Sequence, residues 1–429
     1  MLSTMLIFSL ILSCSHFIVL IICDNNSSNI PLSERQALFD LFNLTQGSKW
    51  IWNDDSHRPR WDFNDPTINP CDSINSWQGL TCIINSGVDS MIFNVIVGIN
   101  LKGYNLNGPL SESIGDMIHL QELVLSNNRM TGTLPISIYN LSSLIVLLID
   151  DNHFNGTLSN SIGQLSQLLK LELRQNYFFG TIPSAIAALT HLKTLTMSYN
   201  SFSGTLPNNA VLTNLILLNV GVNNLIGTIP CGLSNASSLL HLILPKNEFT
   251  GTIPQCWKSA TKLQALFISD NYMTGSMPSF ITEWNEMKLF GFFGNIFIGT
   301  LPFLWNMRSL ETIYAYDNSF TGTIPDMFSQ MPLISELRLQ NNLFIGILPQ
   351  SLSTLQNLKI FFIQSNFLSG SLNNLFKSNK LQLLQVSDNY FSGTLPQARI
   401  TWHFRWTIIL AYNISFPNTT ISAVRTNII

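Results

Sequence analysis

Apolar residues recur along this chain with a period much longer than that of a single helix or strand. Between residues 96 and 404 the frame L-x-x-L-x-L-x-x-N-x-F/L-x-G-x-I/L-P returns every 24 residues, shortened to 23 before Asn223, Asn318 and Asn389. Thirteen copies follow one another. A fixed period of roughly 20 to 50 residues indicates a solenoid in which each repeat forms one coil.

The L-x-L core of each copy predicts a short strand with its apolar residues inward, because side chains alternate between the two faces of a strand. One repeat cannot bury that face alone, so the coils are stable only when they stack. The predicted fold class is an α/β solenoid of about 13 repeats of 23–24 residues, with one long parallel sheet.

Three further slots of the frame have physical reasons. The Asn slot lies where the chain leaves the strand, and its amide can bond backbone groups of its own coil and of the neighbouring coil. A glycine follows four residues later in all thirteen copies, from Gly108 to Gly393. That slot indicates a positive φ or a close approach of adjacent coils. Proline ends the frame in ten copies and bars a continued strand.

Phenylalanine fills the slot two residues after Asn in eight copies. These residues are Phe154, Phe178, Phe202, Phe249, Phe297, Phe320, Phe344 and Phe391. The register points this slot inward, so we expect a stacked core column rather than a ligand-binding surface.

The segment before the repeats divides into two parts. Residues 1–23 contain an uncharged apolar run from Met5 to Cys23, typical of a secretory signal peptide, with an uncleaved signal anchor as the alternative. Residues 24–95 are the predicted N-terminal cap. Ser33 and Gln36 predict a capping box that opens a short helix. The apolar side of this helix would carry Ala37, Leu38, Leu41 and Phe42.

The segment after the repeats is harder to interpret. The frame stops after Pro396, and residues 405–429 are expected to form an atypical C-terminal tail without repeat register. Either this tail is an unusual cap, or the reading frame ends inside a larger receptor. No segment after the N-terminal one reaches a membrane-spanning length.

Composition narrows the class of protein. Only 10% of the residues are charged and the net charge is −3, without a basic block, which argues against nucleic acid as a partner. Eight N-x-S/T sequons, including those at Asn43, Asn140, Asn155 and Asn235, support export. Four cysteines remain after residue 23, an even number that suits disulfides in an exported chain. They are Cys71, Cys82, Cys231 and Cys256.

The repeat frame, with its G-x-I-P segment, resembles the plant-type leucine-rich-repeat family. That family includes receptor-like proteins, receptor-like kinase ectodomains and inhibitors of wall enzymes such as polygalacturonase-inhibiting proteins. The resemblance spans residues 33 to 396. It implies a right-handed superhelix whose parallel sheet lines a concave, ligand-binding face.

The cap carries the family's motifs as well, in Asn69-Pro70-Cys71 and in the W-x-G-L-x-C segment from Trp77 to Cys82. This resemblance implies a Cys71–Cys82 disulfide and a Trp77 side chain that packs over the first coil. Cys231 and Cys256 follow the proline slots of adjacent repeats with an offset of one residue. They are expected either to be bonded across the two coils or to remain two buried free thiols.

Catalytic and metal-binding motifs are missing from the sequence. It has no paired histidine ligands, nucleophile elbow, phosphate-binding loop or kinase signature. Asp150 and Asp151 are adjacent carboxylates, but their register places them on a solvated edge. We therefore expect no enzyme, no metal and no cofactor.

The outward positions around L-x-L change character along the chain. Repeats two to five carry polar residues there, namely Gln121, Glu122, Lys170, Glu172, Arg174, Thr194 and Thr196. From repeat eight the face becomes aromatic, with Phe267, Phe293, Tyr314, Tyr316 and Phe362, and with Glu336, Arg338 and Gln340 among them. Exposed aromatic residues and arginine are typical of binding sites, so we assign the ligand-binding site to the five aromatic residues and Arg338. The alternative is that the aromatic side chains only stabilise neighbouring strands.

These observations predict a secreted or cell-surface recognition module without catalysis. Its expected partner is an extracellular protein, peptide or glycan, with a co-receptor as a further candidate. A soluble inhibitor of secreted cell-wall hydrolases is the alternative function.

Overall fold

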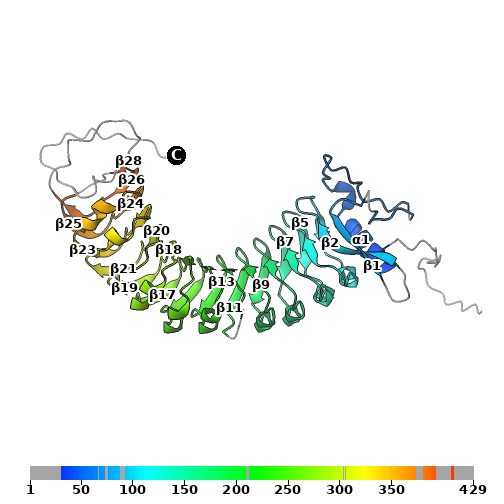
Figure 1. Ribbon diagram of the computed structural model, residues 1–429, viewed down its shortest axis with the longest axis horizontal. Helices are drawn as coiled ribbons and strands as arrows, with labels where there is room; N and C mark the ends of the chain where they lie inside the picture. Colours follow the sequence, from blue (N-terminus) through cyan, green and yellow to red (C-terminus); the bar gives the residue numbers. More distant parts are fainter. Residues whose placement is uncertain are drawn as a thin grey trace, which may run out of the picture.

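The computed structural model describes residues 30–65, 67–72, 76–86, 92–208, 212–302, 304, 306–372, 380–392 and 407–409. The expected signal segment and most of the expected C-terminal tail lie outside these residues. The described chain winds into a curved solenoid whose two ends rise on the same side of the arc (Figure 1). The predicted leucine-rich-repeat solenoid is confirmed.

One long sheet lines the concave side of the arc. Its fifteen described strands begin with β1 (Leu80–Ser86), which pairs antiparallel with β2 (Ile92–Asn100), and every later pair is parallel. The further strands are β4 (Glu122–Val124), β6 (Val146–Leu148), β8 (Lys170–Glu172), β10 (Thr194–Thr196), β12 (Leu217–Asn219), β14 (His241–Ile243), β16 (Ala265–Phe267), β18 (Leu289–Gly291), β20 (Thr312–Tyr314), β22 (Glu336–Arg338), β24 (Ile360–Phe362), β26 (Leu383–Gln385) and β28 (Thr407–Ile409).

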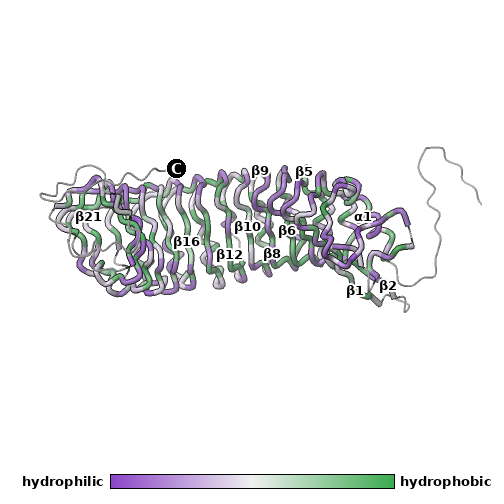
Figure 2. The backbone as a smooth tube through the Cα atoms, turned by 90° about the horizontal axis from the view of Figure 1, so that it is seen from above, coloured by the Kyte–Doolittle hydropathy of each residue, from purple (hydrophilic) through white to green (hydrophobic). Residues whose placement is uncertain are grey.

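A second parallel sheet runs along one edge of the solenoid, as the view onto the concave side shows (Figure 2). Its strands are β3 (Asn107–Pro109), β5 (Arg129–Thr133), β7 (His153–Gly156), β9 (Tyr177–Thr181), β11 (Ser201–Thr205), β13 (Asn224–Gly227), β15 (Glu248–Gly251), β17 (Tyr272–Ser276), β19 (Ile296–Gly299), β21 (Ser319–Gly322), β23 (Leu343–Ile347), β25 (Phe367–Gly370) and β27 (Tyr390–Phe391). We call this sheet the flank.

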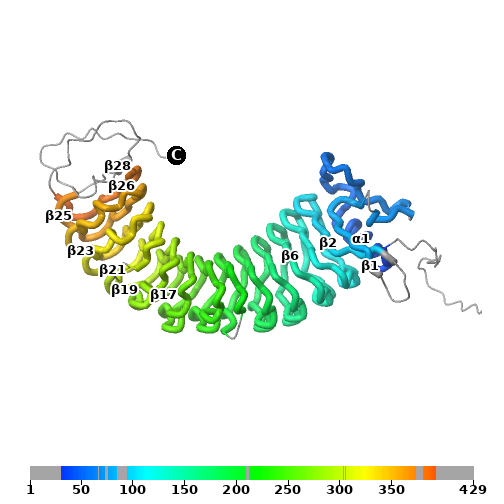
Figure 3. Tube along the Cα trace, in the orientation of Figure 1, coloured from blue at the N-terminus to red at the C-terminus, as the bar shows by residue number. Residues whose placement is uncertain are grey.

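Short 3₁₀ helices follow the flank strands of most described coils. They lie on the convex side of the arc, where the trace turns back toward the concave sheet (Figure 3). They are η3 (Glu112–Asp116), η4 (Ile136–Asn140), η5 (Asn160–Gln164), η6 (Ser184–Ala188), η7 (Cys231–Asn235), η8 (Gln255–Ser259), η9 (Ser279–Glu283), η10 (Phe328–Gln330) and η11 (Gln350–Thr354). Because a 3₁₀ turn is wider than a strand, the convex side is longer than the concave side, and the stack curves.

The asparagine slot works as the sequence predicted. Asn176 donates from Nδ2 to the carbonyl of Ile149 in the preceding coil at 2.9 Å and to that of Leu173 in its own coil at 3.2 Å. Its Oδ1 accepts the backbone N–H of Phe154 at 2.9 Å. Each such asparagine therefore ties one coil to the previous one through groups that would otherwise be buried without partners.

The phenylalanine column is also confirmed as core. Phe154, Phe178 and Phe202 are fully buried, and their rings stack from one coil to the next at centroid distances of 6.4 and 6.1 Å. Phe297, Phe320 and further members repeat the arrangement toward the C-terminal end.

The glycine slot has both properties that its invariance indicated. Gly180 has φ +76°, and a Cβ placed on it would lie 2.8 Å from Thr157 Cγ2 of the preceding coil. A second left-handed position was not predicted. The residue before the Asn slot has φ between about +50° and +60° in most repeats, although it is rarely glycine, as at Gln175, Tyr199 and Val222.

The N-terminal cap differs from the prediction at its first turn. Helix α1 (Leu32–Leu44) starts after Pro31, and no side chain caps it, so the expected capping box of Ser33 and Gln36 is wrong. Gln36 instead bonds Asp40 along the helix at 2.8 Å. Proline at the N-cap already fixes the entry into the helix, which makes a side-chain cap dispensable.

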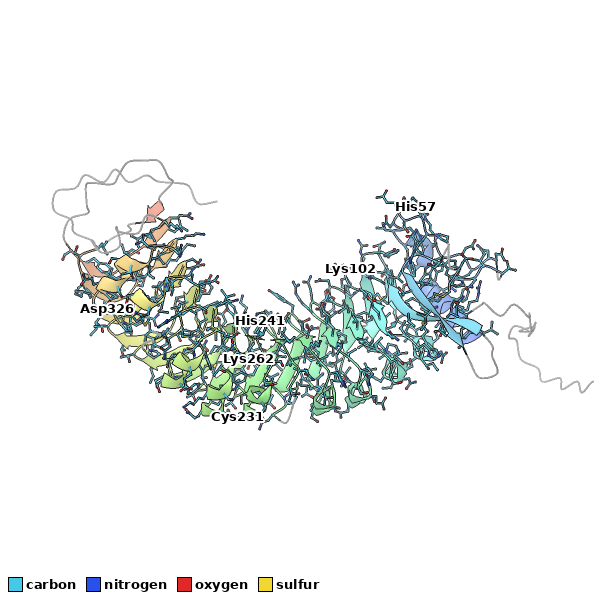
Figure 4. All side chains as sticks on the ribbon, in the orientation of Figure 1. His57, Lys102, Cys231, His241, Lys262 and Asp326 are labelled. Carbon is cyan, nitrogen blue, oxygen red and sulfur yellow. A yellow bond between two sulfur atoms is a disulfide. The ribbon has the colours of Figure 1, made fainter. Side chains whose placement is uncertain are left out.

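The cap core is aromatic and closed by a disulfide. Trp77 is fully buried and stacks on Trp61 with ring centroids 5.8 Å apart. The Cys71–Cys82 disulfide that the resemblance implied is present, with Cα atoms 5.7 Å apart. Cys231 and Cys256 are bonded as well, also with Cα atoms 5.7 Å apart, so the alternative of two free thiols is wrong. This second bond joins η7 to η8 on the convex side, where Figure 4 shows Cys231.

The expectation that repeat register ends at Pro396 is also wrong. Strand β28 adds to β26 in parallel and pairs Leu384 with Ile408, so residues 407–409 continue the concave sheet by one coil. The sequence carries a weak signal for this coil, because Asn413 follows Asn389 by one 24-residue period. The sequence after Asn413 has neither glycine nor proline at the positions where the repeat frame requires them, so the frame could not be recognised in this last coil.

Candidate recognition surface on the concave face

Strand register places the predicted site residues in two rows across adjacent coils. The inner row follows the last residues of the strands, which pair Phe267 with Gly291, Gly291 with Tyr314, Tyr314 with Arg338 and Arg338 with Phe362. The outer row lies two residues further along each coil and contains Phe293 and Tyr316. All six predicted residues are half-buried on the concave side.

Three aromatic side chains of the two rows form one connected cluster. Phe293 stacks on Tyr316 with ring centroids 4.2 Å apart and an angle of 10° between the planes. Tyr314 meets both rings edge-on, at 6.3 Å from Phe293 and 6.4 Å from Tyr316. These contacts fix the rings before any ligand arrives, so little side-chain entropy remains to be lost on binding.

Arg338 braces the inner row. Its guanidinium carbon lies 5.3 Å from the ring centre of Tyr314 and 5.0 Å from that of Phe362, within the range of cation–π attraction. Glu336 neutralises the guanidinium, and the same carboxylate accepts the Tyr314 hydroxyl at 2.7 Å. The predicted residues Tyr314, Arg338 and Phe362 thus lie in contact, and Arg338 faces its own neighbours more than it faces solvent.

The tyrosines of the cluster stay neutral at physiological pH. Burial raises the pKa of Tyr314 to about 12, and the hydrogen bond to Glu336 adds to the effect. Burial also raises the pKa of Tyr316, with a further contribution from Asp270. Both phenols therefore present a hydroxyl and a ring rather than a phenolate.

Phe267 lies over a glycine that the sequence reasoning overlooked. A Cβ on Gly291 would lie 2.5 Å from Phe267 Cδ1, so the Phe267 ring covers the backbone of β18 where a side chain would otherwise stand. A glycine at an outward strand position between aromatic residues was the available signal, since glycine in a strand marks close approach.

Repeats two to five keep the polar character that was predicted for them. Lys170 and Glu172 form an ion pair at 2.9 Å, and the Arg174 guanidinium carbon lies 5.5 Å from the Tyr199 ring centre. Asp150 accepts the Ser126 hydroxyl at 2.6 Å, and burial raises the pKa of Asp151. These contacts occupy the side chains with one another and supply no catalytic arrangement.

The predicted glycosylation positions avoid the concave face. Asn43 lies in α1, Asn140 and Asn235 lie in convex 3₁₀ helices, and Asn155 lies on the flank strand β7. All four side chains are exposed. Glycans at these positions would leave the aromatic cluster uncovered.

The described part of the chain lacks both a metal-holding cluster of side chains and a membrane-spanning helix. It contains no group of three or more His, Cys, Asp or Glu side chains that could hold a metal ion. Among its helices, none has the length and apolar character required to cross a membrane.

Comparison with protein families agrees with the geometry. The Leucine Rich Repeat family matches at residues 119–141, 191–210 and 309–331. Three segments of the chain thus match this family's model, and the stacked parallel strands have the leucine-rich-repeat fold. No enzyme family matched it, and a comparison with curated proteins found no match.

Solved structures show which leucine-rich-repeat proteins it is similar to. The PEPR1–AtPEP1 complex has a TM-score of 0.75 at 26% identity, over 90% of this chain and 52% of that one. The Arabidopsis receptor kinase HAESA, in complex with the peptide hormone IDA and the co-receptor SERK1, has a TM-score of 0.71 at 29% identity, over 82% and 58%. The plant peptide hormone receptor RGFR1 in complex with RGF2 has a TM-score of 0.68 at 26% identity, over 79% and 60%.

The leucine-rich-repeat chain is therefore structurally similar to plant receptor kinase ectodomains, including those of peptide-hormone receptors. Its match spans only a little over half of each of these chains, between 52% and 60%.

Proposed function

We propose that this protein is an extracellular recognition module that binds a peptide through the aromatic cluster of its concave face, as receptor-like proteins do in signalling or defence. The observation that carries the proposal is the preorganised cluster of Phe293, Tyr314 and Tyr316, braced by Arg338 on the concave face. Half-exposed aromatic side chains held rigid by their neighbours are the composition of binding hot spots.

An extracellular location is supported by two independent features. Both disulfides suit an oxidising compartment, and the four sequon asparagines that the structure describes are exposed and lie away from the concave face. A peptide is favoured over a glycan or a folded protein because two of the similar structures are the peptide hormone receptor RGFR1 with RGF2 and HAESA with the peptide hormone IDA. The HAESA complex also contains the co-receptor SERK1, and we extend that role to a second partner of this chain.

The test is binding of secreted protein to an array of acetylated, amidated hexapeptides of random composition, with a glycan array alongside. The variant Tyr314→Ala/Tyr316→Ala removes two rings of the cluster, so peptide retention is expected to fall at least about tenfold, a typical loss when hot-spot residues are truncated. The matched control is Tyr177→Ala/Tyr272→Ala, whose rings are 60% and 57% exposed on the flank. Undiminished retention by the cluster variant would overturn the proposal, and retention on the glycan array alone would replace the peptide by a glycan.

A further inference from the structure

The outer row of the aromatic cluster is bordered by two aspartates, Asp270 and Asp317, one on each side of the Phe293 coil. Backbone hydrogen bonds link successive coils at this level, from Asp270 N to Phe293 O at 2.8 Å and from Gly294 N to Tyr316 O at 3.1 Å. We define the acidic–aromatic patch as Asp270, Phe293, Gly294, Tyr316 and Asp317. It covers repeats eight to ten at the centre of the predicted site.

Gly294 leaves a gap between two carboxylates. The residue has φ +62° and occupies the left-handed position before the Asn slot, with Asp270 and Asp317 at the same position of the two adjacent coils. Asp270 Oδ1 stands where a Cβ of Gly294 would be, so this carboxylate leans over the glycine. The side chain that would normally separate the two acids is missing.

Few groups of the described chain pair with the carboxylates of Asp270 and Asp317. Asn341 donates to Asp317 Oδ1 at 2.6 Å, but within the described residues the Asp270 carboxylate has no hydrogen bond and no ion pair within 4 Å. Burial raises the pKa of Asp270 first of all, Lys246 in the preceding coil opposes this rise, and Asp317 adds to it through like-charge repulsion. Arg338 does not serve these acids as a partner, because Glu336 already pairs with it.

Two buried oxygen atoms in the outer row also lack partners. Phe293 and Tyr316 are flanked in this row by Ser269, which is 0% exposed, and by Gln340, which is 7% exposed. Among the described residues, neither Ser269 Oγ nor Gln340 Oε1 has a hydrogen-bond partner. A buried oxygen without a partner is unfavourable, so this level of the coil has acceptor capacity that the protein itself does not satisfy.

The chemistry of this surface is complementary to an organic cation. Carboxylates and amide oxygens accept hydrogen bonds, and electron-rich rings attract positive charge at close range. A metal ion fits poorly, because the described residues contain no set of three or more ligating side chains. A guanidinium or ammonium group carries several donors and a positive charge, which suit both the carboxylates and the rings.

We infer that the acidic–aromatic patch binds the positively charged side chain of an arginine or lysine in the ligand peptide. The inference rests on the proposed function and specifies the ligand: a basic residue whose guanidinium or ammonium lies between Asp270 and Asp317 and against the Phe293–Tyr316 stack.

The experiment compares hexapeptides that differ only by charge, with arginine or its neutral isostere citrulline at one position, and with lysine or acetyl-lysine at the same position. Wild-type protein is expected to retain the charged members about tenfold better, as removal of one ionic partner from a partly buried pair predicts. In Asp270→Asn/Asp317→Asn, which changes charge without changing shape, the preference should vanish. The matched control is Asp388→Asn, which lies at the same position of the last repeat, before Asn389. This variant should keep the preference for the charged peptides.

The outcomes separate the two proposals. If wild-type protein retains peptides through Tyr314 and Tyr316 without preferring arginine over citrulline, the inference is wrong and the proposed function stands. If it retains no peptide, both are wrong. The reversed variant Asp270→Lys/Asp317→Lys should favour acidic hexapeptides, and an unchanged preference for arginine in it would also overturn the inference.

Discussion

Glu34 connects the cap helix to the repeats through a buried carboxylate. The side chain is 1% exposed, and its Oε2 accepts the backbone N–H of Ile96 in β2 at 2.9 Å. Burial raises the pKa of Glu34 from 4.5 to about 7, and the hydrogen bond from Ile96 only partly opposes it. A carboxyl group at this place is therefore easily protonated near neutral pH.

Because the pKa of Glu34 is raised, we expect the free energy of unfolding of the cap to fall as the pH rises. Between the unfolded pKa of 4.5 and the folded pKa of about 7, the folded chain holds a proton that the unfolded chain has released, so the free energy of unfolding falls with rising pH. Above about pH 7 the loss is complete and amounts to at most about 3 kcal/mol. Urea unfolding followed by the fluorescence of the cap tryptophans, at several values between about pH 5 and pH 8, measures it.

The control is Glu34→Gln, which accepts the same N–H and stays neutral throughout. Its cap stability is expected to be flat over this range, because the carboxylates with lowered pKa, Asp65, Glu112 and Asp326, are ionised there in both states. An identical pH dependence in wild type and variant would contradict the assignment.

Among the structural elements, the asparagine ladder is the connection between coils that can be tested most directly. Asn176→Ala would leave the Phe154 N–H and three backbone carbonyls without the partner they have now. We expect a loss of about 2–4 kcal/mol, since unpaired buried backbone groups cost about 1–3 kcal/mol each and some will reach water. Chemical unfolding measures it, and the exposed neighbour substitution Gln175→Ala should cost little. Equal effects of the two changes would show that the ladder contributes nothing specific.

Those elements that a repeated side chain specifies could be predicted from the sequence. The strands, the Asn ladder and the phenylalanine column each favour one residue type at one slot, so its recurrence along the repeats reveals them. The left-handed residue before Asn176 could not be recognised, because the coil imposes this conformation on Gln175, Tyr199 and Val222 alike. At this position the fold of the coil outweighs the preference of the residue for a negative φ. Because the side chains differ from repeat to repeat, the sequence contains no pattern that reveals the conformation.

The candidate site shows the same limit. Register alone placed Phe293, Tyr316 and Arg338 on the concave face. It could not show that Glu336 holds Arg338 or that Asp270 leans over Gly294, since these depend on side-chain torsions. The Cys231–Cys256 bond stayed open for a similar reason, because its one-residue offset is resolved only by the shape of η7 and η8.

At the scale of the whole molecule, each coil contacts mainly its two neighbours, so its stability is close to a sum of local terms. From β2 to β28, each described strand of the concave sheet pairs in parallel only with strands of adjacent coils, apart from the antiparallel pair of β1 and β2. The cap lies at one end of this stack and the aromatic cluster in repeats eight to twelve. A change in the early repeats should therefore leave the cluster intact.

Deletion of residues 153–176 tests this modularity. It joins Asn152 directly to Tyr177, which keeps the frame N-x-F-x-G and removes one complete coil of 24 residues. The shortened protein is expected to fold, with a urea m-value lower by roughly one-thirteenth because that much less surface is buried. Binding of the hexapeptides should match that of wild type.

Deletion of residues 153–164 removes only half a coil and places Leu165 where the flank strand should begin, so this control should not fold. If the full-coil deletion were as disruptive as the half-coil deletion, the coils would not be interchangeable units, and the stability of the solenoid would depend on contacts longer in range than those between neighbours.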